Sequence, residues 1–242
     1  MIKLENTEVM GLEAAIRGMR NPLNSWEQSD SKYCSEYDHP PIEGSCEYCP
    51  YDNMCNKSET AMQQMYLVES NDLDLMTRLR NAGTDHRKFM RMITVYLDIT
   101  APLYWWKEFD TYKVGTVANS CSTMHKIAAK EFTLEDFSHE HLNDDRSAEV
   151  SNLEWFEYLI IHLNRDRRRF IETKDKQYWW QMIQLLPSSY NQRRTVMLNY
   201  EVLANIYKSR RNHKLDEWHT FCDWIEKLPY SELITGKEKS NG

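Results

Sequence analysis

The sequence predicts an α+β fold: a mostly helical domain with a small antiparallel sheet and a cysteine-rich insertion. Residues 93–100 alternate between apolar and polar side chains, which is the period of a half-buried strand. Several later segments repeat their apolar residues at helical spacing. Four of the 6 cysteines lie between residues 34 and 55. We therefore expect one domain over residues 1–242, with residues 24–58 inserted into it.

The composition sets limits on the class of protein. With 242 residues and 41% hydrophobic side chains, the chain can bury one sizeable core. Its formal net charge of −7 disfavours a nucleic-acid partner. No apolar run is long enough for a membrane span, and the first residues lack the apolar core of a signal peptide. We expect a cytoplasmic protein without a membrane partner.

The first elements are expected in the following order. Residues 8–20 are predicted to form a helix that ends at Asn21-Pro22, with Val9 and Leu12 on its apolar face. Residues 71–81 form a second predicted helix, capped by Gly83, and residues 93–100 form the strand.

The stretch from Ala101 to Ile127 changes character in its middle. Pro102 is expected as a first helical residue, because a helix tolerates a missing N–H there. Aromatic side chains follow up to Tyr112, and small polar residues dominate from Thr116 to Thr123. This pattern predicts a ligand pocket with an apolar floor and a polar lip. A buried aromatic helix followed by a loop is the simpler alternative.

The second half of the chain is expected to be helical. Thr133 and Asp136 have the spacing of a capping box, which predicts a helix start. Further helices are predicted over residues 147–172, 174–186, 199–211 and 213–227.

The cysteine cluster predicts a metal site. Cys46 and Cys49 are separated by two residues, so that both sulfurs can bind one ion, and Cys34 and Cys55 complete a set of four. Four thiolates suit zinc and equally suit an iron–sulfur cluster. Free thiols in a flexible segment are the alternative. Neither a dinucleotide-binding nor a P-loop glycine motif occurs in the sequence.

Two segments resemble the flavin-dependent thymidylate synthases. In the first, a gapless alignment places His86 on a family histidine, Ala101-Pro102 on its Ala-Pro, and residues 111–124 on its Arg-His-Arg-x-x-Ser-x-Asn-Glu-x-Ser-x-Arg-Tyr signature. The second segment matches a family pattern of Leu-Pro, two asparagines, an arginine, a histidine and a tryptophan. The matching residues are Leu186-Pro187, Asn199, Asn205, Arg210, His213 and Trp218.

The signature itself differs from the family pattern at each of its specified positions. Thr111-Tyr112-Lys113 replaces Arg-His-Arg, Ala118-Asn119 replaces Asn-Glu, and Thr123-Met124 replaces Arg-Tyr. Thr116 stands at the first serine and Cys121 at the second. The arginines that hold phosphate in the family are therefore absent, and threonine offers no bidentate fork in their place.

The resemblance implies a flavoenzyme. Such an enzyme binds FAD, methylates dUMP with methylenetetrahydrofolate, uses NADPH as reductant, and assembles as a homotetramer with sites between subunits. By this resemblance the cofactor-binding residues are His86, Lys88, Lys113, Asn199 and Asn205. The substrate-binding residues are Glu108, Asn119, Ser120, Cys121, Thr123 and Arg210, of which Cys121 and Arg210 are also catalytic candidates. Trp105, Trp106 and Tyr112 are candidates to stack on a flavin or pterin ring, and phosphate charge is expected from Arg87, Lys88, Lys107, Lys113, Arg193, Arg194 and Arg210.

Cys121 suggests a specific mechanism. A thiolate is a better nucleophile than a hydroxyl and can add to C6 of a uracil ring; a buried, inert thiol is the alternative. Two other functions remain open: a sister enzyme that modifies another deoxypyrimidine nucleotide, and a non-catalytic or regulatory nucleotide-binding relative. A cluster-bearing nucleic-acid module is disfavoured by the acidic net charge.

Overall fold

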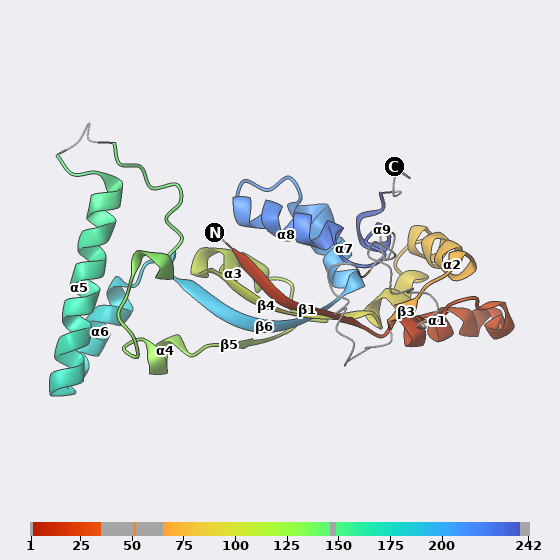
Figure 1. Ribbon diagram of the computed structural model, residues 1–242, viewed down its shortest axis with the longest axis horizontal. Coiled ribbons are helices and arrows are strands. Elements are labelled where there is room, and N and C mark those ends of the chain that lie inside the picture. Colours follow the sequence, from red (N-terminus) through yellow and green to blue (C-terminus); the bar gives the residue numbers. More distant parts are fainter. Residues whose placement is uncertain (1, 35–50, 52–64, 146–148, 238–242) are drawn as a thin grey trace, which may run out of the picture. The chain divides into compact units, whose positions relative to one another are not determined.

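The computed structural model in Figure 1 describes residues 2–34, 51, 65–145 and 149–237. The chain divides into two compact units. Unit 1 comprises residues 1–3, 98–111 and 118–195, and unit 2 comprises residues 4–97, 112–117 and 196–242. A single domain with an insertion at residues 24–58 stays a prediction.

The elements combine helices with a small antiparallel sheet, which confirms the predicted fold class. The strands are β1 (Lys3–Met10), β2 (Lys32–Tyr33), β3 (Tyr66–Leu67), β4 (Thr94–Pro102), β5 (Val117–Ser120) and β6 (Asn191–Asn199). The α-helices are α1 (Leu12–Arg20), α2 (Ser70–Asn81), α3 (Leu103–Phe109), α4 (Thr123–Lys126), α5 (Asn152–Thr173), α6 (Lys176–Leu185), α7 (Tyr200–Arg210), α8 (Asp216–Glu226) and α9 (Glu232–Thr235). A 3-10 helix, η4, spans Arg87–Arg91.

The four-stranded sheet has the strand order β1-β4-β6-β5. The central strand β4 confirms the predicted alternation, since Val95, Leu97 and Ile99 are buried. Strands β5 and β6 were not predicted from the sequence. All four residues of β5 are exposed, which is expected of an edge strand and explains its polar composition.

The predicted helix over residues 8–20 was wrong in its first turn. Residues up to Met10 belong to the edge strand β1, and α1 begins only at Leu12. Gly11 makes the turn with φ 91°, and a Cβ at this position would lie 2.2 Å from the carbonyl oxygen of Met92. A glycine is therefore required where the strand ends.

The aromatic helix α3 is part of the core. Pro102 ends β4 and caps the helix, so the prediction that it is the first helical residue was wrong. The side chains of Trp105 and Trp106 are 0% and 1% exposed, and the Trp105 ring stacks on Phe109 with 5.1 Å between centroids. Both indoles are thus enclosed by protein, and the expectation that they stack on a flavin or pterin was wrong.

The remaining helices follow the predicted periodicity, with ends displaced by a few residues. The Thr133–Asp136 capping box is formed, but it opens a short 3-10 helix rather than an α-helix. A second capping box, Ser151 with Glu154, begins α5. Within the described residues, no helix has the length and apolar character that a membrane span requires.

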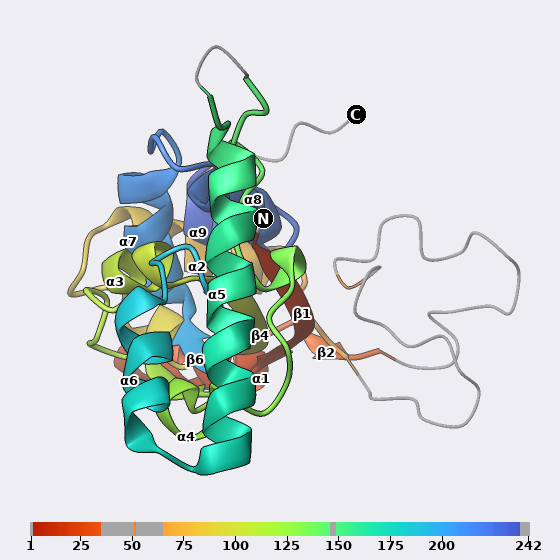
Figure 2. The same cartoon turned by 90° about the vertical axis from the view of Figure 1, so that its left-hand side faces the viewer.

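Unit 1 has its core beneath two neighbouring helices. Helices α5 and α6 lie side by side in both views (Figures 1 and 2). The buried apolar cluster of this unit consists of Ile127, Phe132, Phe137, Ile160, Leu163 and Met182.

Unit 2 has its core around helix α7. This helix packs against α8, α9 and η4, and most of its side chains are buried. Trp218 and Phe221 of α8 are fully buried, with their rings 5.9 Å apart in an edge-to-face arrangement.

A buried ion pair joins α1 to α2 in unit 2. The Arg20 Nε lies 2.6 Å from Asp72 Oδ1, and both side chains are almost fully buried. The second carboxylate oxygen accepts hydrogen bonds from the Ser29 and Ser31 hydroxyls. Burial by itself raises the pKa of Asp72, but the hydrogen bonds from Ser31, Ser29 and Arg20 outweigh it and hold the pKa below its usual value.

We expect Asp72→Asn to destabilise the protein by about 3–5 kcal/mol at pH 7, because Arg20 is then left buried without its counter-charge. The lowered pKa of Asp72 means that its contribution is complete above the unfolded value of about 4 and is lost as the pH falls through the folded value. The difference between variant and wild type should therefore shrink below pH 4. Denaturant unfolding at pH 7 and pH 3 measures both effects. The exposed neighbour Asp74 provides the control, and equal effects of Asp74→Asn and Asp72→Asn would contradict the assignment.

Candidate functional site

A cavity in unit 1 brings together several of the predicted substrate-binding residues. Ser120, Cys121 and Thr123 line it, and its volume is about 520 Å³. The other lining residues are Leu103, Ser122, Met124, Ile183, Leu186, Gln192 and Arg194. The lining thus combines hydroxyl, thiol, amide and guanidinium groups with aliphatic and thioether side chains.

The turn between β5 and α4 presents Cys121 to this cavity. The Cys121 N–H donates to the Arg193 carbonyl at 3.0 Å, and the Ser122 hydroxyl accepts from the His125 N–H at 3.2 Å as the cap of α4. The Cys121 side chain is exposed. Burial, with a smaller contribution from Cys121, raises the pKa of the nearby Tyr190.

Gln192, on the neighbouring strand β6, fixes this turn by hydrogen bonds. Its amide nitrogen donates to the Cys121 carbonyl and to the Thr123 Oγ1, both at 3.1 Å. Its amide oxygen accepts from the Arg194 Nε at 3.0 Å. Sequence reasoning missed Gln192, because β6 was not predicted. A polar residue at an inward position of this strand was the available signal.

Arg194 is the cation of this cavity. Its guanidinium lies 4.1 Å above the Trp106 ring, and its Nη1 donates to Asp110 at 2.7 Å. Trp106 is fixed in turn by its indole N–H, which donates to the Gln192 carbonyl at 2.9 Å. The guanidinium is thus stacked and hydrogen-bonded in one orientation.

Two other predicted substrate residues belong to unit 1 but do not line the cavity. Asn119 is exposed on β5, and Glu108 is partly buried on α3. Their proposed contact with substrate stays a prediction.

Arg210, the remaining substrate and catalytic candidate, lies in unit 2. Its Nε donates to the Tyr112 hydroxyl at 2.9 Å, and its guanidinium lies 4.9 Å from the Trp218 ring centroid. Tyr112 stands where the family signature has its histidine, so one of the altered signature residues is a direct partner of Arg210.

The predicted cofactor residues also lie in unit 2. His86, Lys88 and Lys113 are exposed, the first two at η4. Between them in sequence, Arg87 forms an ion pair with the buried Glu201 at 2.9 Å and donates to the Asn205 Oδ1 at 3.5 Å. His86, Arg87 and Lys88 thus place three nitrogen-bearing side chains at the start of η4.

Asn199 has a structural part in the same unit. Its Oδ1 accepts from the Val202 N–H at 3.0 Å and caps α7, while its Nδ2 lies 3.5 Å from the Gly115 carbonyl. The side chain is buried, with both ends of the amide engaged in these contacts.

The predicted metal ligands are described only in part. Cys34 is buried, and its N–H donates to the Met65 carbonyl at 2.7 Å. Cys46, Cys49 and Cys55 lie outside the described residues. In the part of the chain that is described, no group of three or more His, Cys, Asp or Glu side chains is arranged to hold a metal ion.

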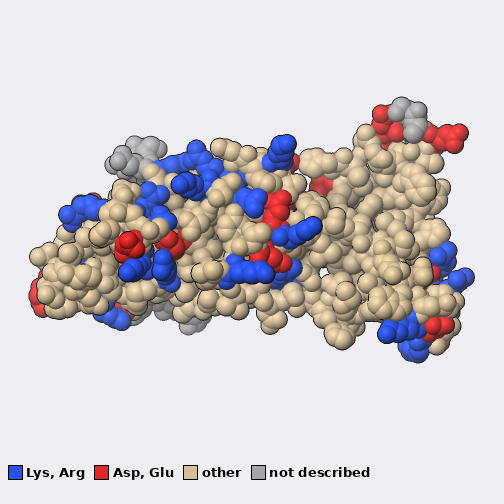
Figure 3. Space-filling model, turned by 180° about the vertical axis from the view of Figure 1, so that it is seen from behind, with Lys and Arg blue, Asp and Glu red and all other residues tan. Residues whose placement is uncertain are grey.

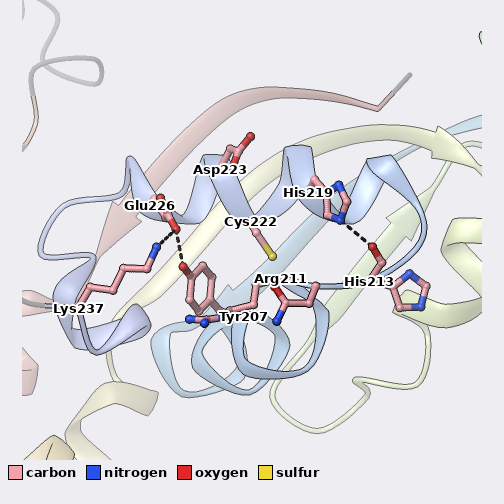
Figure 4. A pocket seen from close by; sticks show the side chains of 9 residues that line it. Tyr207, Arg211, His213, His219, Cys222, Asp223, Glu226 and Lys237 are labelled. Atoms are coloured by element: carbon pink, nitrogen blue, oxygen red, sulfur yellow. Dashed lines mark hydrogen bonds and ion pairs between the residues drawn. The ribbon is translucent and has the colours of Figure 1, made fainter.

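A second cavity, of about 620 Å³, lies between α7 and α8 in unit 2 (Figure 4). Its charges are largely paired within the protein: Glu226 binds the Lys237 ammonium at 2.6 Å and the Tyr207 hydroxyl. His219 contacts the His213 carbonyl at 2.6 Å. None of the predicted substrate, cofactor or metal residues lines this cavity.

Solved structures with the same fold include flavin-dependent thymidylate synthases and a related methylase. Thymidylate synthase X (ThyX) from Helicobacter pylori, with FAD and dUMP, aligns with a TM-score of 0.61 at 15% identity, over 98% of each chain. The UMP/dUMP methylase PolB from Streptomyces cacaoi, with 5-Br dUMP, aligns with a TM-score of 0.53 at 11% identity, over 98% of this chain and 95% of that chain. No protein-family model and no curated protein matches the sequence. At these identities the similarity establishes the fold, which is that of ThyX.

Cys121 and Cys222 should differ in their reaction with thiol reagents. Burial, reinforced by Asp223 and Glu226, raises the pKa of Cys222 to about 11. At pH 8 only about 0.1% of such a thiol is the reactive thiolate. We expect iodoacetamide to alkylate the exposed Cys121 well before Cys222, as read from peptide mass spectra over time. Equal labelling rates in the folded protein would contradict this, and labelling in denaturant serves as the control.

Proposed function

We propose that this chain is a nucleotide methylase of the flavin-dependent thymidylate synthase type. It transfers a one-carbon unit from methylenetetrahydrofolate to C5 of dUMP, with FAD as cofactor and NADPH as reductant. The observation that carries the proposal is the cavity shared by Ser120, Cys121 and Thr123, in a chain with the ThyX fold. Its aliphatic and thioether side chains suit the face of a pyrimidine, and its hydroxyl and guanidinium groups suit a phosphate.

The residues of unit 2 have the chemistry to hold FAD. Lys88, Arg87 and His86 provide nitrogen donors at η4, next to the Asn205 amide. Such donors suit the pyrophosphate of a dinucleotide, and we propose that these residues bind it. FAD, when bound, supplies the redox chemistry of the reaction. The contribution of Asn199 is to fix the start of α7, since both ends of its amide contact the protein.

We propose that Cys121 activates the pyrimidine. A thiolate at this position adds to C6 of the uracil ring, so that a sulfur–carbon bond forms and the C5–C6 electron pair moves to C5 and O4. The resulting enolate makes C5 nucleophilic toward the one-carbon unit. C5 bonds to the methylene carbon of the folate as one of that carbon's bonds to a folate nitrogen breaks, and loss of the C5 proton with elimination of the thiolate restores the C5–C6 double bond. Breaking the second carbon–nitrogen bond would release the folate, and the hydride that completes the methyl group would come from NADPH by way of FAD. The exposure of the Cys121 side chain to the cavity supports this role over that of an inert core thiol.

A sister enzyme with another pyrimidine nucleotide is the second candidate. The likeness to PolB favours it, because that protein has the same fold and is a methylase of UMP as well as of dUMP. A non-catalytic nucleotide-binding relative is the third. The pairing of Arg210 with Tyr112 favours this possibility, since it occupies Arg210 within the protein.

The enzyme activity is tested by isolating the protein and measuring its chemistry. We expect a yellow protein with flavin absorbance, and release of tritium from C5-labelled dUMP when folate and NADPH are present. Cys121→Ala should lower turnover by at least roughly 100-fold, because the proposed covalent step is lost. Cys222→Ala, which removes a thiol from the other cavity, is the matched control after its melting temperature confirms folding.

Each result separates the candidates. Tritium release from labelled UMP but not from dUMP would favour the sister enzyme. Flavin or nucleotide binding without turnover would favour the regulatory relative. Full turnover by Cys121→Ala would exclude the thiolate mechanism while leaving the methylase function in place.

The homo-oligomer implied by the resemblance has a candidate interface on helix α5. Trp155, Tyr158 and Ile161 follow one another at spacings of three residues and are 65%, 54% and 59% exposed. Figure 3 shows a broad uncharged surface over the α5–α6 part of unit 1, with Lys and Arg gathered near one end. Exposed aromatic ridges of this kind mark protein–protein interfaces.

We expect the double substitution Trp155→Glu and Tyr158→Glu to weaken self-association by at least about tenfold, because two aromatic anchors become charges in a desolvated interface. Light scattering coupled to size-exclusion chromatography over a concentration series measures the mass. Glu157→Gln, on the same helix, is the control. A wild-type protein that is monomeric throughout, or a variant that keeps its mass, would contradict this interface.

A further inference from the structure

The cavity around Cys121 contains a cation that comes from outside the signature segment, residues 111–124. Among the described residues that line it, Arg194 alone carries a positive charge. The signature position of this cavity that is an arginine in the family is Thr123 here. A guanidinium is therefore present in the cavity, but it comes from strand β6.

The orientation of Arg194 leaves part of its fork available. Its Nε is used by Gln192 and one Nη1 hydrogen bond goes to Asp110, while Nη2 makes no hydrogen bond to the described residues. The side chain is 15% exposed, and stacking on Trp106 restricts its motion. A partly desolvated, preoriented guanidinium binds an anion more strongly than a freely moving surface lysine does.

Two hydroxyl groups of the cavity are poised as hydrogen-bond donors. The Thr123 Oγ1 accepts a hydrogen bond from the Gln192 amide, and the Ser122 Oγ accepts one from the His125 N–H. Neither hydroxyl donates to an acceptor within the described residues, so both protons are available to a ligand. One cation and two hydroxyl donors match the oxygens of a phosphate monoester.

Two of the other candidate cations form ion pairs away from this cavity. Arg193 is the next residue of β6 and points to the opposite side of the strand, where it pairs with Asp98 at 2.8 Å. In unit 2, Arg87 pairs with Glu201. Of the seven cations considered from the sequence, Arg194 is the one that lines the cavity of Cys121.

We propose that Arg194 is the phosphate anchor of this cavity and makes it selective for a nucleoside monophosphate over the free nucleoside. The Ser122 and Thr123 hydroxyls donate to the same phosphate. This inference deepens the proposed function and rests on it for the identity of the nucleotide. Asp110 holds the Arg194 guanidinium in place and neutralises part of its positive charge.

The test compares dUMP with deoxyuridine, which lacks the phosphate, in calorimetric titrations of the full-length protein. Arg194→Met should weaken dUMP binding by about 10- to 100-fold and leave deoxyuridine binding within about twofold, because charged hydrogen bonds are lost only to the phosphate. Arg193→Met, on the opposite side of the same strand, is the matched control and should change neither affinity.

Two further variants keep the test decisive if Arg194→Met does not fold. Arg194→Lys retains the charge without the fork and should weaken dUMP binding by an intermediate factor. Asp110→Asn removes the competing carboxylate and should tighten dUMP binding by roughly two- to fivefold without affecting deoxyuridine. Unchanged dUMP affinity in both variants would overturn the proposal.

The outcomes also separate this inference from the proposed function. If dUMP binds but Arg194→Met weakens dUMP and deoxyuridine equally or not at all, the phosphate anchor is wrong and the methylase proposal stands. If another monophosphate, such as UMP, binds in an Arg194-dependent way and dUMP does not, the anchor stands and the dUMP substrate is wrong. A wild-type protein that binds no nucleoside monophosphate overturns the anchor.

Discussion

The packing of Trp106 beneath strand β6 is the interaction on which the candidate site depends. This indole is buried among the aromatic residues of α3, and it donates a hydrogen bond to the Gln192 carbonyl. Its ring face carries the Arg194 guanidinium. The backbone contact fixes the strand, and the strand directs the Gln192 side chain to the turn that holds Cys121. A core residue thereby sets the position of a thiol, a guanidinium and a hydroxyl, because each group is tied to the next by a directional hydrogen bond or by stacking.

The sequence allowed the helical part of the fold to be predicted, because α2, α5, α7 and α8 are amphipathic over two or more turns. Strand β4 was equally clear. The edge strands were not, since β5 has no buried residue and β1 leads into α1 through a single glycine. The central strand β6 was missed because Gln192 and Arg194 occupy inward positions where an apolar residue is the usual signal. The clustering of Ser120, Cys121 and Thr123 could be expected from their proximity in sequence. Arg194 could not be singled out from seven cations without knowing which side of β6 it faces.

The sequence between β2 and β3 contains Cys46, Cys49 and Cys55, and the pairing of these two strands explains why the fold can accommodate it. Strands β2 and β3 pair antiparallel, with Lys32 opposite Leu67, so the chain leaves and returns at neighbouring points. The Asp72 carboxylate binds Ser29 and Ser31, which precede β2, and belongs itself to helix α2, which follows β3. An insertion between ends that are already held together costs little closure entropy, which increases only slowly with loop length. The buried Arg20–Asp72 pair thus secures the core of unit 2 independently of what the segment binds.

Under the proposed function, the altered signature amounts to a relocation of positive charge from residue 123 to Arg194. An arginine at position 123 would place a second guanidinium in the cavity that already holds Arg194, with Asp110 as the only carboxylate contact of that guanidinium among the described residues. Like charges in a partly desolvated cavity repel, so a second guanidinium would cost free energy there whenever no anion is bound between the two. With the cation supplied from β6, the residue at 123 needs only to accept from Gln192 and donate to a ligand, and threonine does both. If Arg194 binds the phosphate, the residue at position 121 does not have to be a hydrogen-bonding serine. A thiol there, in a cavity whose phosphate charge is carried by a different strand, is consistent with a nucleotide enzyme that has redistributed its binding groups and kept its substrate class.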